Sequence, residues 1–258
     1  MTPVPGATRQ TVILAAGSGS RLSTQRGDLP KPLVPVAGRA LIEHALDQAV
    51  AAGVEEAIVV TGNAADQMRE HLARLTLPIR LNLVHNHRFL EPNGVSLLAA
   101  APYVTGPFYL QMADHVFAEP VLQRLDPEPP GAPGAMRLLV DFQPVGVDEE
   151  DATKVRVREG LIRAIGKDVR PFDAVDTGCF RLDPLIFAAL REVERIEPPS
   201  VTLGMRWLVA RDGLAAVALS GVRWTDVDTP ADYATAEQLL GGRSRRRADQ
   251  ILAAIRQF

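Results

Sequence analysis

The first 112 residues alternate short apolar runs with longer segments that have helical periodicity. The runs predict strands at Thr11–Ala16, Glu56–Thr61, Ile79–His85 and Pro107–Met112, and the intervening segments predict helices at Ala40–Ala52, Ala64–Leu75 and Gly94–Ala101. Continuous apolar runs are typical of strands that are covered by helices on both faces. Strict alternation of strands and helices indicates parallel pairing. We therefore expect an α/β fold with a Rossmann-like, mostly parallel sheet sandwiched by helices.

The pattern changes after the Pro/Gly-rich stretch 126–134. Short strands are predicted at Met136–Asp141, Thr153–Arg158, Leu161–Lys167, Ala174–Leu182 and Leu214–Leu219, and helices at Asp183–Glu194, Thr202–Arg211 and Pro230–Leu240. Glu159-Gly160, between two of these strands, is a hairpin signal. We expect one domain over residues 1–242, with a first half at 11–125 and a β-rich second half at 136–240. A basic linker and a last helix should follow at 243–258.

Charge and composition exclude several classes of protein. The net charge is only −3, whereas a wide nucleic-acid interface requires a basic excess, so we expect no nucleic-acid partner. No run approaches the ~18 apolar residues of a membrane span, and the polar first ten residues lack the apolar core of a signal peptide. The single cysteine, Cys179, fits a reducing compartment and is expected to be buried in a strand. We expect a cytoplasmic protein.

The loop after the first strand carries unusual chemistry. The stretch Leu14–Pro32 reads LAAGSGSRLSTQRGDLPKP. It is neither a dinucleotide fingerprint, which requires a third glycine where Leu22 stands, nor a Walker A loop, which requires Gly-Lys-Ser/Thr. Gly17 and Gly19 still allow backbone N–H groups to approach phosphates, and Arg21 and Lys31 add positive charge. We expect this loop to hold a nucleoside triphosphate.

Lysine is rare in this chain. The 28 basic residues comprise 25 arginines and three lysines: Lys31, Lys154 and Lys167. Lysine is a compact point charge and arginine a planar fork, so the two are not interchangeable at a phosphate. The three lysines are therefore candidates for functional sites.

Carboxylates from distant segments indicate a divalent cation. Asp114 ends a predicted strand, and Asp226 and Asp228 follow another strand near the end of the domain. Ligands bind at the carboxyl edge of open α/β sheets, and Mg²⁺ prefers oxygen donors. Taken alone, an aspartate at a strand end is more often a turn or capping residue than a cation ligand. His85, His87 and His115 lack zinc-ligand spacing with cysteine, and His115 is expected to pack behind Asp114.

The motifs resemble those of the sugar-phosphate nucleotidylyltransferases. That family is marked by L-A-A-G-x-G-x-R-L and P-K-P-L-x-P-V, found here at 14–22 and 30–36. Within it, the chain is most similar to the CTP:inositol-1-phosphate cytidylyltransferases. The further motifs that carry this likeness are NGxSLL at 93–98, MADH at 112–115, ATKV at 152–155, IGK at 165–167, DTG at 176–178 and WxDVDTP at 224–230.

The resemblance implies roles for individual residues. Mg²⁺ would be held by Asp114 and by Asp228 or Asp226, with Asp228 favoured. Arg21 and Lys31 would hold the triphosphate, and Lys167 would grip the phosphate of the acceptor. The remaining nucleotide-binding positions are expected at Leu14, Ala16, Gly17, Gly19, Gly62, Asn93, Gly94 and Ser96. Further acceptor contacts are expected from Lys154, Asp141, Glu150, Thr153 and Asp176.

Three functions remain open at this stage. The resemblance favours an enzyme that makes CDP-inositol from CTP and inositol 1-phosphate. Another nucleotide or acceptor, such as a sugar phosphate, a cyclitol phosphate, phosphocholine or a phosphonate, is the alternative, because Phe142 stands where many family members have a basic residue. A non-catalytic nucleotide sensor is disfavoured because the charged residues are all present.

The chain ends in a basic segment. Residues 243–247 read RSRRR. Most simply this is a solvated linker, and the alternative is contact with an anionic membrane or with a membrane phosphotransferase of the kind fused to relatives in this family.

Overall fold

The computed structural model describes residues 8–17, 29–62, 64–126, 136–145 and 147–241. Arg21 and Gly19, and the basic segment after residue 241, lie outside the described residues. Among the described residues, no helix combines the length and apolarity needed to cross a membrane.

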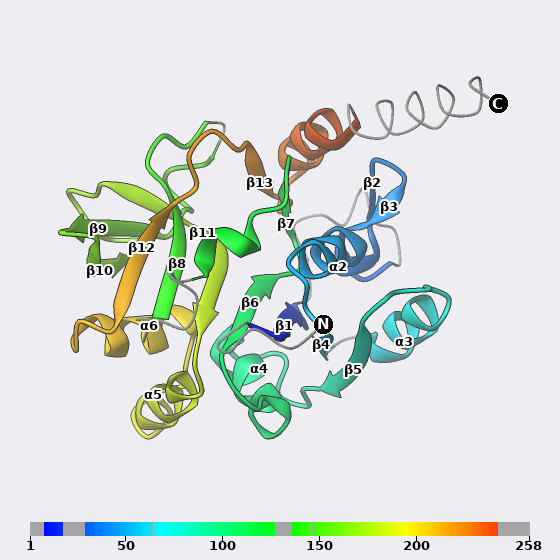
Figure 1. Ribbon diagram of the computed structural model, residues 1–258, viewed down its shortest axis with the longest axis horizontal. Helices are drawn as coiled ribbons and strands as arrows, with labels where there is room; N and C mark the ends of the chain where they lie inside the picture. Colours follow the sequence, from blue (N-terminus) through cyan, green and yellow to red (C-terminus); the bar gives the residue numbers. More distant parts are fainter. Residues whose placement is uncertain (1–7, 18–28, 63, 127–135, 146, 242–258) are drawn as a thin grey trace.

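A nine-stranded sheet runs through the molecule and includes strands from both halves of the chain (Figure 1). One side of it is parallel and has the order β5 (Arg80–His85), β4 (Glu56–Thr61), β1 (Gln10–Ala15), β6 (Phe108–Met112). The strands lie within one residue of their predicted ends. Because they are parallel, their carboxyl ends share one edge of the sheet.

The second half extends the same sheet in a mostly antiparallel way. Beyond β6 the order is β11 (Ala174–Leu182), β8 (Met136–Asp141), β12 (Leu214–Ala218), β10 (Leu161–Gly166) and β9 (Lys154–Arg158). Only β8 and β12 pair in parallel there. The sheet is therefore mixed, not mostly parallel. The β9–β10 turn explains part of this, since a two-residue turn with positive φ at Glu159 and Gly160 joins only antiparallel strands.

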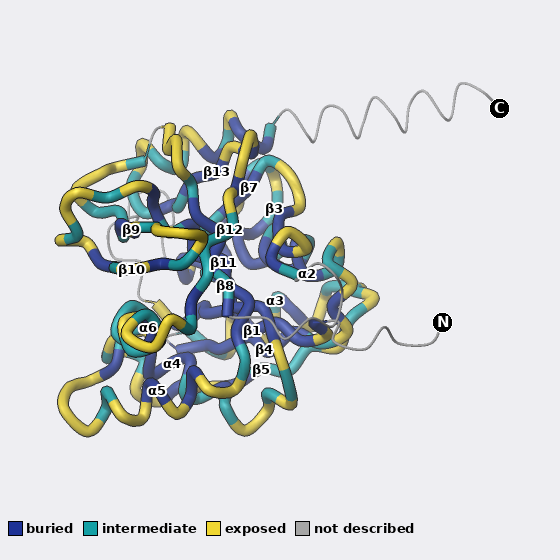
Figure 2. Tube along the Cα trace, turned by 60° about the vertical axis from the view of Figure 1, so that its left-hand side comes forward, coloured by how far each residue is buried: buried dark blue, intermediate teal, exposed yellow. Residues whose placement is uncertain are grey.

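Helices cover both faces of the parallel strands, as predicted. Alternate residues of β1 point to opposite sides: Val12 and Leu14 pack with the core that includes α4 (Asn93–Ala100), α5 (Leu185–Glu194) and α6 (Val201–Val209). Ile13 and Ala15 pack with α2 (Leu41–Ala51) and α3 (Ala65–Ala73). Figure 2 shows the middle of the sheet as buried, and β1, β4 and β6 are buried along nearly their whole length, whereas the outer strand β5 is partly exposed.

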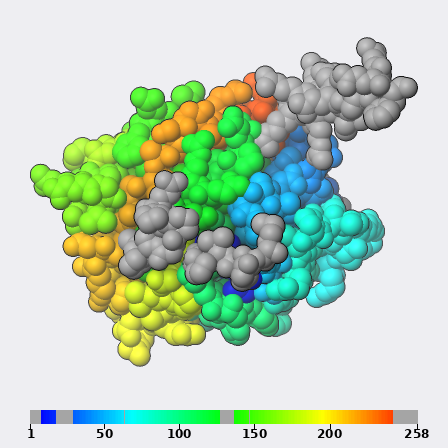
Figure 3. Space-filling view, in the orientation of Figure 1, coloured from blue at the N-terminus to red at the C-terminus, as the bar shows by residue number. Residues whose placement is uncertain are grey.

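Short elements that sequence reasoning did not predict complete the fold. They are the 3₁₀ helices η2 (Lys31–Leu33), η3 (Ala101–Tyr103) and η4 (Leu122–Leu125), and two small sheets, β2 (Pro35–Val36) with β3 (Arg39–Ala40) and β7 (His115–Phe117) with β13 (Trp224–Asp226). The helix predicted at Pro230–Leu240 is confirmed and covers 230–241. In Figure 3, residues from the last part of the described chain (orange) lie directly against residues from its middle (green). Cys179 is buried in β11, as expected.

Candidate active site

The small sheet of β7 and β13 brings the distant aspartates together. Its strands pair antiparallel, with His115 opposite Asp226, and the backbone N–H of Val227 donates to the carbonyl of Asp114 at 2.9 Å. Asp114 directly follows the β6 segment at the carboxyl edge of the parallel strands. Backbone hydrogen bonds thus fix the WxDVDT motif at this edge of the sheet.

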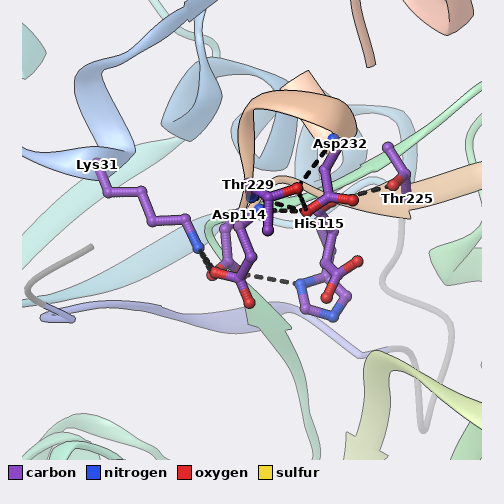
Figure 4. Close-up of polar contacts among 8 residues, drawn as sticks. Lys31, Asp114, His115, Thr225, Thr229 and Asp232 are labelled. Carbon is purple, nitrogen blue, oxygen red and sulfur yellow. Dashed lines mark hydrogen bonds and ion pairs between the residues drawn. The ribbon is translucent and has the colours of Figure 1, made fainter. Parts of the chain in front are cut away.

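Lys31 lies between two of these carboxylates. Its Nζ is 2.5 Å from Oδ2 of Asp114 and also bonds Oδ1 of Asp228 (Figure 4). The lysine side chain is only 8% exposed. Burial opposes its charge, but the two carboxylates outweigh burial and raise the pKa of Lys31 above its ordinary value. Burial likewise opposes ionisation of Asp114, yet Lys31 and His115 hold the pKa of that carboxyl well below its usual range. Lys31 and Asp114 are therefore both charged at neutral pH.

A capping box holds Asp228 in place. Thr229 precedes the helix at 230–241, and Oδ2 of Asp232 accepts from the backbone N–H of Thr229 at 2.7 Å and from its hydroxyl at 2.8 Å. The backbone N–H of Asp232 donates back to the threonine hydroxyl at 3.3 Å. This reciprocal arrangement fixes the first turn of a helix. Asp228, one residue before the cap, is therefore presented to Lys31 from a rigid helix start.

His115 connects the other side of Asp114 to the second half of the chain. Its Nδ1 lies 2.8 Å from Oδ1 of Asp114, and its ring stacks on Trp224 with centroids 5.7 Å apart. Gly178 of the DTG motif makes room for this ring, since a Cβ there would lie 2.7 Å from Cδ2 of His115. Sequence reasoning interpreted His115 as packing behind Asp114. The structure adds a direct hydrogen bond to that carboxylate.

A cleft of about 700 Å³ opens beside this cluster. The residues that line it include six of the predicted site residues: Asn93, Thr153, Lys167, Asp176, Asp226 and Asp228. Burial raises the pKa of Asp176 to about 6, although the backbone N–H of Gly178 donates to its carboxylate at 2.7 Å. Burial also raises the pKa of Asp226. The cleft therefore joins the Lys31 cluster to hydrogen-bonding groups of the β-rich half.

Lys167 and Lys154 have different environments. Lys167 is exposed at the cleft and forms an ion pair with Asp151. Lys154 is buried, and its ammonium donates to the carbonyls of Ala152 at 3.1 Å and Lys167 at 2.8 Å. Burial lowers the pKa of Lys154. The predicted contact between Lys154 and an acceptor is therefore not supported, because the buried ammonium donates to two backbone carbonyls, one of which is that of Lys167.

Asp141 also lies away from the cleft. It borders a separate cavity of about 640 Å³, and both of its oxygens are engaged. Oδ2 accepts from the indole N–H of Trp224 at 2.9 Å, and Oδ1 accepts from the backbone of Gln143 at 2.9 Å. The structure thus places Asp141 on a different cavity from Thr153, Lys167 and Asp176, and its contact with an acceptor stays a prediction. Glu150 is exposed and also lies outside the set of residues that line the cleft.

The predicted nucleotide-binding positions cluster at the carboxyl ends of β1 and β4 and at the start of α4. Ala16 and Gly17 follow β1 and Leu14 lies within it, while Gly62 follows β4 and packs so closely that a Cβ would lie 2.7 Å from the carbonyl oxygen of Ala16. At these positions the chain can therefore contact a ligand through its backbone atoms.

Side chains at the start of α4 serve the fold. Oδ1 of Asn93 accepts from the backbone N–H of Val201 at 2.9 Å, and Gly94 packs against the backbone of Pro199. Ser96 is buried and accepts a hydrogen bond from Asn86 at 2.9 Å. Ser96 is therefore held inside the protein by Asn86 and is not among the residues that line the cleft.

Comparison with known proteins assigns the first half of the chain. Residues 11–128 match the family described as the MobA-like NTP transferase domain. Over these residues the chain is similar to an NTP transferase domain of the MobA-like family. The match covers β1 to η4 and so includes Lys31 and Asp114, and the second carboxylate segment lies beyond it.

Relatives of this NTP transferase domain extend over most of the chain. A protein of Rubrobacter xylanophilus named bifunctional IPC transferase and DIPP synthase is 34% identical over 232 residues, which are 89% of this chain and 51% of that protein. A CMP-5'-(3-aminopropyl)phosphonate synthase of Streptomyces rubellomurinus is 30% identical over 246 residues, which are 88% of this chain and 38% of the relative. The chain thus spans about half the length, or less, of these curated relatives.

A solved structure shares the fold of the NTP transferase domain. The inositol-1-phosphate CTP transferase of T. maritima superposes with a TM-score of 0.80, 24% sequence identity, and coverage of 92% of this chain and 98% of that chain. The likeness extends through the β-rich half, so the mixed sheet is the architecture of a known nucleotidyltransferase.

The donor set fits a hard divalent cation. Among the described residues, no group of three or more His, Cys, Asp or Glu side chains has metal-binding geometry. Asp114 and Asp228 nevertheless already surround one positive group, the Lys31 ammonium, and carboxylate oxygens are the ligands that Mg²⁺ prefers. In an NTP transferase domain these two residues would hold Mg²⁺ together with oxygens of the triphosphate.

Proposed function

We propose that this chain transfers CMP from CTP to inositol 1-phosphate, releasing pyrophosphate and forming CDP-inositol. One observation carries the proposal: the Lys31 cluster with Asp114 and Asp228 lies at one end of a cleft that also exposes Lys167 and Asp176. The named relatives and the shared fold support the choice of CTP and inositol phosphate.

Charge explains why the cleft requires these residues. A triphosphate carries about four negative charges and a phosphate monoester about two, and each like-charge pair at 4 Å costs about 4 kcal/mol at an effective dielectric of 20. Lys31 and Arg21 balance the triphosphate, and Lys167 balances the acceptor phosphate. Mg²⁺, held by Asp114 and Asp228, would neutralise the triphosphate oxygens.

The reaction then requires no protein nucleophile. An oxygen of the acceptor phosphate is already ionised at neutral pH and forms a new bond to the α-phosphorus of CTP. The bond from that phosphorus to the bridging oxygen breaks, and pyrophosphate leaves with the electron pair. The protein supplies position and charge, as for phosphoryl transfer in general. Asp176 and Thr153 accept hydrogen bonds from hydroxyls of the polyol ring.

A pyrophosphate-release assay tests the proposal. The purified chain is supplied with Mg²⁺, with each of ATP, CTP, GTP and UTP, and with inositol 1-phosphate, glucose 1-phosphate, phosphocholine or 3-aminopropylphosphonate. We expect CTP with inositol 1-phosphate to give the highest kcat/KM. A higher value for UTP or GTP, or for another acceptor, contradicts this choice of substrates.

Two lysine variants serve as a matched pair in the same assay. Lys167→Met is expected to raise the KM for the acceptor about tenfold or more, the scale of a lost charged hydrogen bond, and to leave the KM for CTP within twofold. Lys154→Met is expected to lower the unfolding temperature, because its ammonium bonds two buried carbonyls. An unchanged acceptor KM in Lys167→Met removes Lys167 from the acceptor site.

The proposal places the enzyme in the cytoplasm, with peripheral membrane contact through the basic residues 243–247. Each basic residue near an anionic surface contributes about 1 kcal/mol. A chain that ends at Gly242 should pellet with phosphatidylserine vesicles less than the full chain does. Equal pelleting of the two chains rules the membrane contact out.

A further inference from the structure

A line of three contacts leads from Asp141 to the carboxylate of Asp114. The Asp141 carboxylate accepts from the indole N–H of Trp224, Trp224 stacks on His115, and Nδ1 of His115 bonds Oδ1 of Asp114. The separations are 2.9 Å, 5.7 Å between ring centroids, and 2.8 Å. Every member except Asp141 lies at the cleft or in the Lys31 cluster.

The two oxygens of Asp114 are divided between different partners. Oδ2 bonds Lys31, on the side where a cation would be held, and Oδ1 bonds His115. A carboxylate only accepts, so Nδ1 of His115 must carry the proton. His115 thereby fixes the rotation of the Asp114 carboxylate and aims Oδ2 at the cation position.

Trp224 holds the ring of His115 in this orientation. The indole is 6% exposed and stacks on Phe117 as well, with centroids 6.0 Å apart. Phe117 and His115 are two residues apart on β7 and therefore share one face of that strand. Two stacked rings set the plane of the indole but leave its position within that plane free, and the bond to Asp141 removes this freedom.

We propose that Asp141 is a positioning residue that acts through Trp224 and His115 on the cation-binding carboxylate of Asp114. The inference rests on the proposed function of that carboxylate. It also gives a role to Asp141, which borders a separate cavity and is not among the residues that line the cleft. A buried indole N–H requires an acceptor, and Asp141 supplies it from the neighbouring cavity.

The test uses Mn²⁺ binding without nucleotide, measured by the loss of the free Mn²⁺ electron paramagnetic resonance signal. Asp141→Ala should weaken Mn²⁺ binding by about tenfold, the lower end of the effect of removing a partner that orients a metal ligand. Asp141→Asn should restore it to within about threefold, because an amide oxygen still accepts from the indole. Gln143→Ala, a neighbour on the same cavity, is the control and should bind Mn²⁺ as the wild type does.

A double-mutant cycle separates the effect of the Asp141–Trp224 hydrogen bond from general damage to the fold. Trp224→Phe keeps an aromatic ring on His115 but loses the donor, so it should weaken Mn²⁺ binding as much as Asp141→Ala. The double variant should be no worse than either single one, because both changes remove the same hydrogen bond. Additive losses, or a lowered unfolding temperature with unchanged Mn²⁺ affinity, overturn the proposal.

Turnover gives an independent readout and separates this inference from the proposed function. With CTP and inositol 1-phosphate, Asp141→Ala should lower kcat and leave the acceptor KM within twofold. A raised acceptor KM in both Asp141→Ala and Asp141→Asn would instead make Asp141 an acceptor ligand. If no nucleotide is turned over at all, the proposed function fails, while the Mn²⁺ cycle still decides the role of Asp141.

Discussion

Nζ of Lys31 lies 2.5 Å from Oδ2 of Asp114, a residue 83 positions later in the chain, and the same nitrogen bonds Asp228, 197 positions later. One ammonium thus bridges two carboxylates that the fold holds side by side, and the three groups together keep one net negative charge. The contact ties a 3₁₀ helix after the first strand to Asp114, just before β7, and to Asp228, just after β13. Stability and cation binding should therefore respond together when this lysine is changed.

Replacing Lys31 with Met should destabilise the protein in the absence of divalent cations. The two carboxylates then repel each other without a counter-charge, and we expect a loss of about 2 kcal/mol, less than the 3–5 of a fully buried pair because both carboxylates are partly exposed. Urea denaturation measures this, and added Mg²⁺ should recover part of the loss. Arg163→Met, which breaks the more exposed pair with Asp212, should cost about 1 kcal/mol or less. Equal effects of the two substitutions contradict a special role for Lys31.

The Lys31–Asp114 pair should also affect how the free energy of unfolding depends on pH in the acid range. The pKa of Asp114 lies below its ordinary value of 3.8 in the folded protein, so the folded state holds this group ionised more firmly than the unfolded state does. Its contribution is therefore complete above the ordinary pKa and is lost as the pH falls below it. Wild type should lose stability more steeply than Asp114→Asn below pH 3.8. Parallel curves would show that the pair adds nothing.

Asp228 and Asp226 should differ in Mn²⁺ binding. Asp228 shares Lys31 with Asp114, whereas Asp226 lines the cleft opposite His115 and has a raised pKa. We expect Asp228→Asn to weaken Mn²⁺ binding by about tenfold or more and Asp226→Asn to weaken it less. The reverse order assigns the cation to Asp226.

Asp176 should make the protein less stable as the pH rises from about 4 to about 6. Its pKa increases from 3.8 to about 6 on folding, so in this range the unfolded state has released a proton that the folded state retains. By linkage, stability falls through this window and levels off above it, by about 2 kcal/mol at 1.36 kcal/mol per pKa unit with a discount for partial exposure. Asp176→Asn should flatten the curve, as measured by urea denaturation at each pH. Asp66→Asn, on an exposed side chain, should leave it unchanged.

Gly178 and Gly38 form a matched pair for the packing of His115. Both have positive φ, 73° and 79°, so alanine is strained at either position. Only at Gly178 would the new Cβ meet another group, the His115 ring at 2.7 Å, whereas within the described structure nothing lies within 4 Å at Gly38. We expect Gly38→Ala to cost about 1 kcal/mol and Gly178→Ala about 1–3 kcal/mol more, in line with overpacking. Equal losses in thermal unfolding would mean that the ring moves aside freely.

Periodicity was sufficient to predict the long elements. β1, β4 and β6 are continuous apolar runs in the sequence. Because ligands bind at the carboxyl ends of such strands, the position of Asp114 could be predicted from the sequence. The β7–β13 sheet could not, because strands of three residues are too short to show a period. Without that pairing, Asp228 was favoured over Asp226 only by the resemblance to a family.

Lys154 and Asp141 show where residue chemistry alone misleads. Lys154 is one of three lysines in an arginine-rich chain, and its rarity pointed to a phosphate. The structure gives another reason for a compact ammonium, because it fits between two carbonyls in a buried space. Asp141 was expected to bind hydroxyls, whereas its partner is an indole that is 83 residues away in the sequence. Both outcomes depend on long-range packing. By contrast, Thr229 and Asp232 have the spacing of a capping box and could have been found from the sequence.

The pairing of β7 with β13 has a consequence for how the protein matures on the ribosome. Residues 11–128, the part matched by the family, provide Lys31 and Asp114 but not the Asp228 segment that completes the cluster. A nascent chain that has formed β1 to β6 therefore carries Lys31 and Asp114 without the second carboxylate of the cluster. The cluster is complete only when β13, near the end of the described chain, has paired with β7 and brought Asp228 to Lys31. Divalent cation binding during synthesis should thus report completion of the whole sheet, not of its first half.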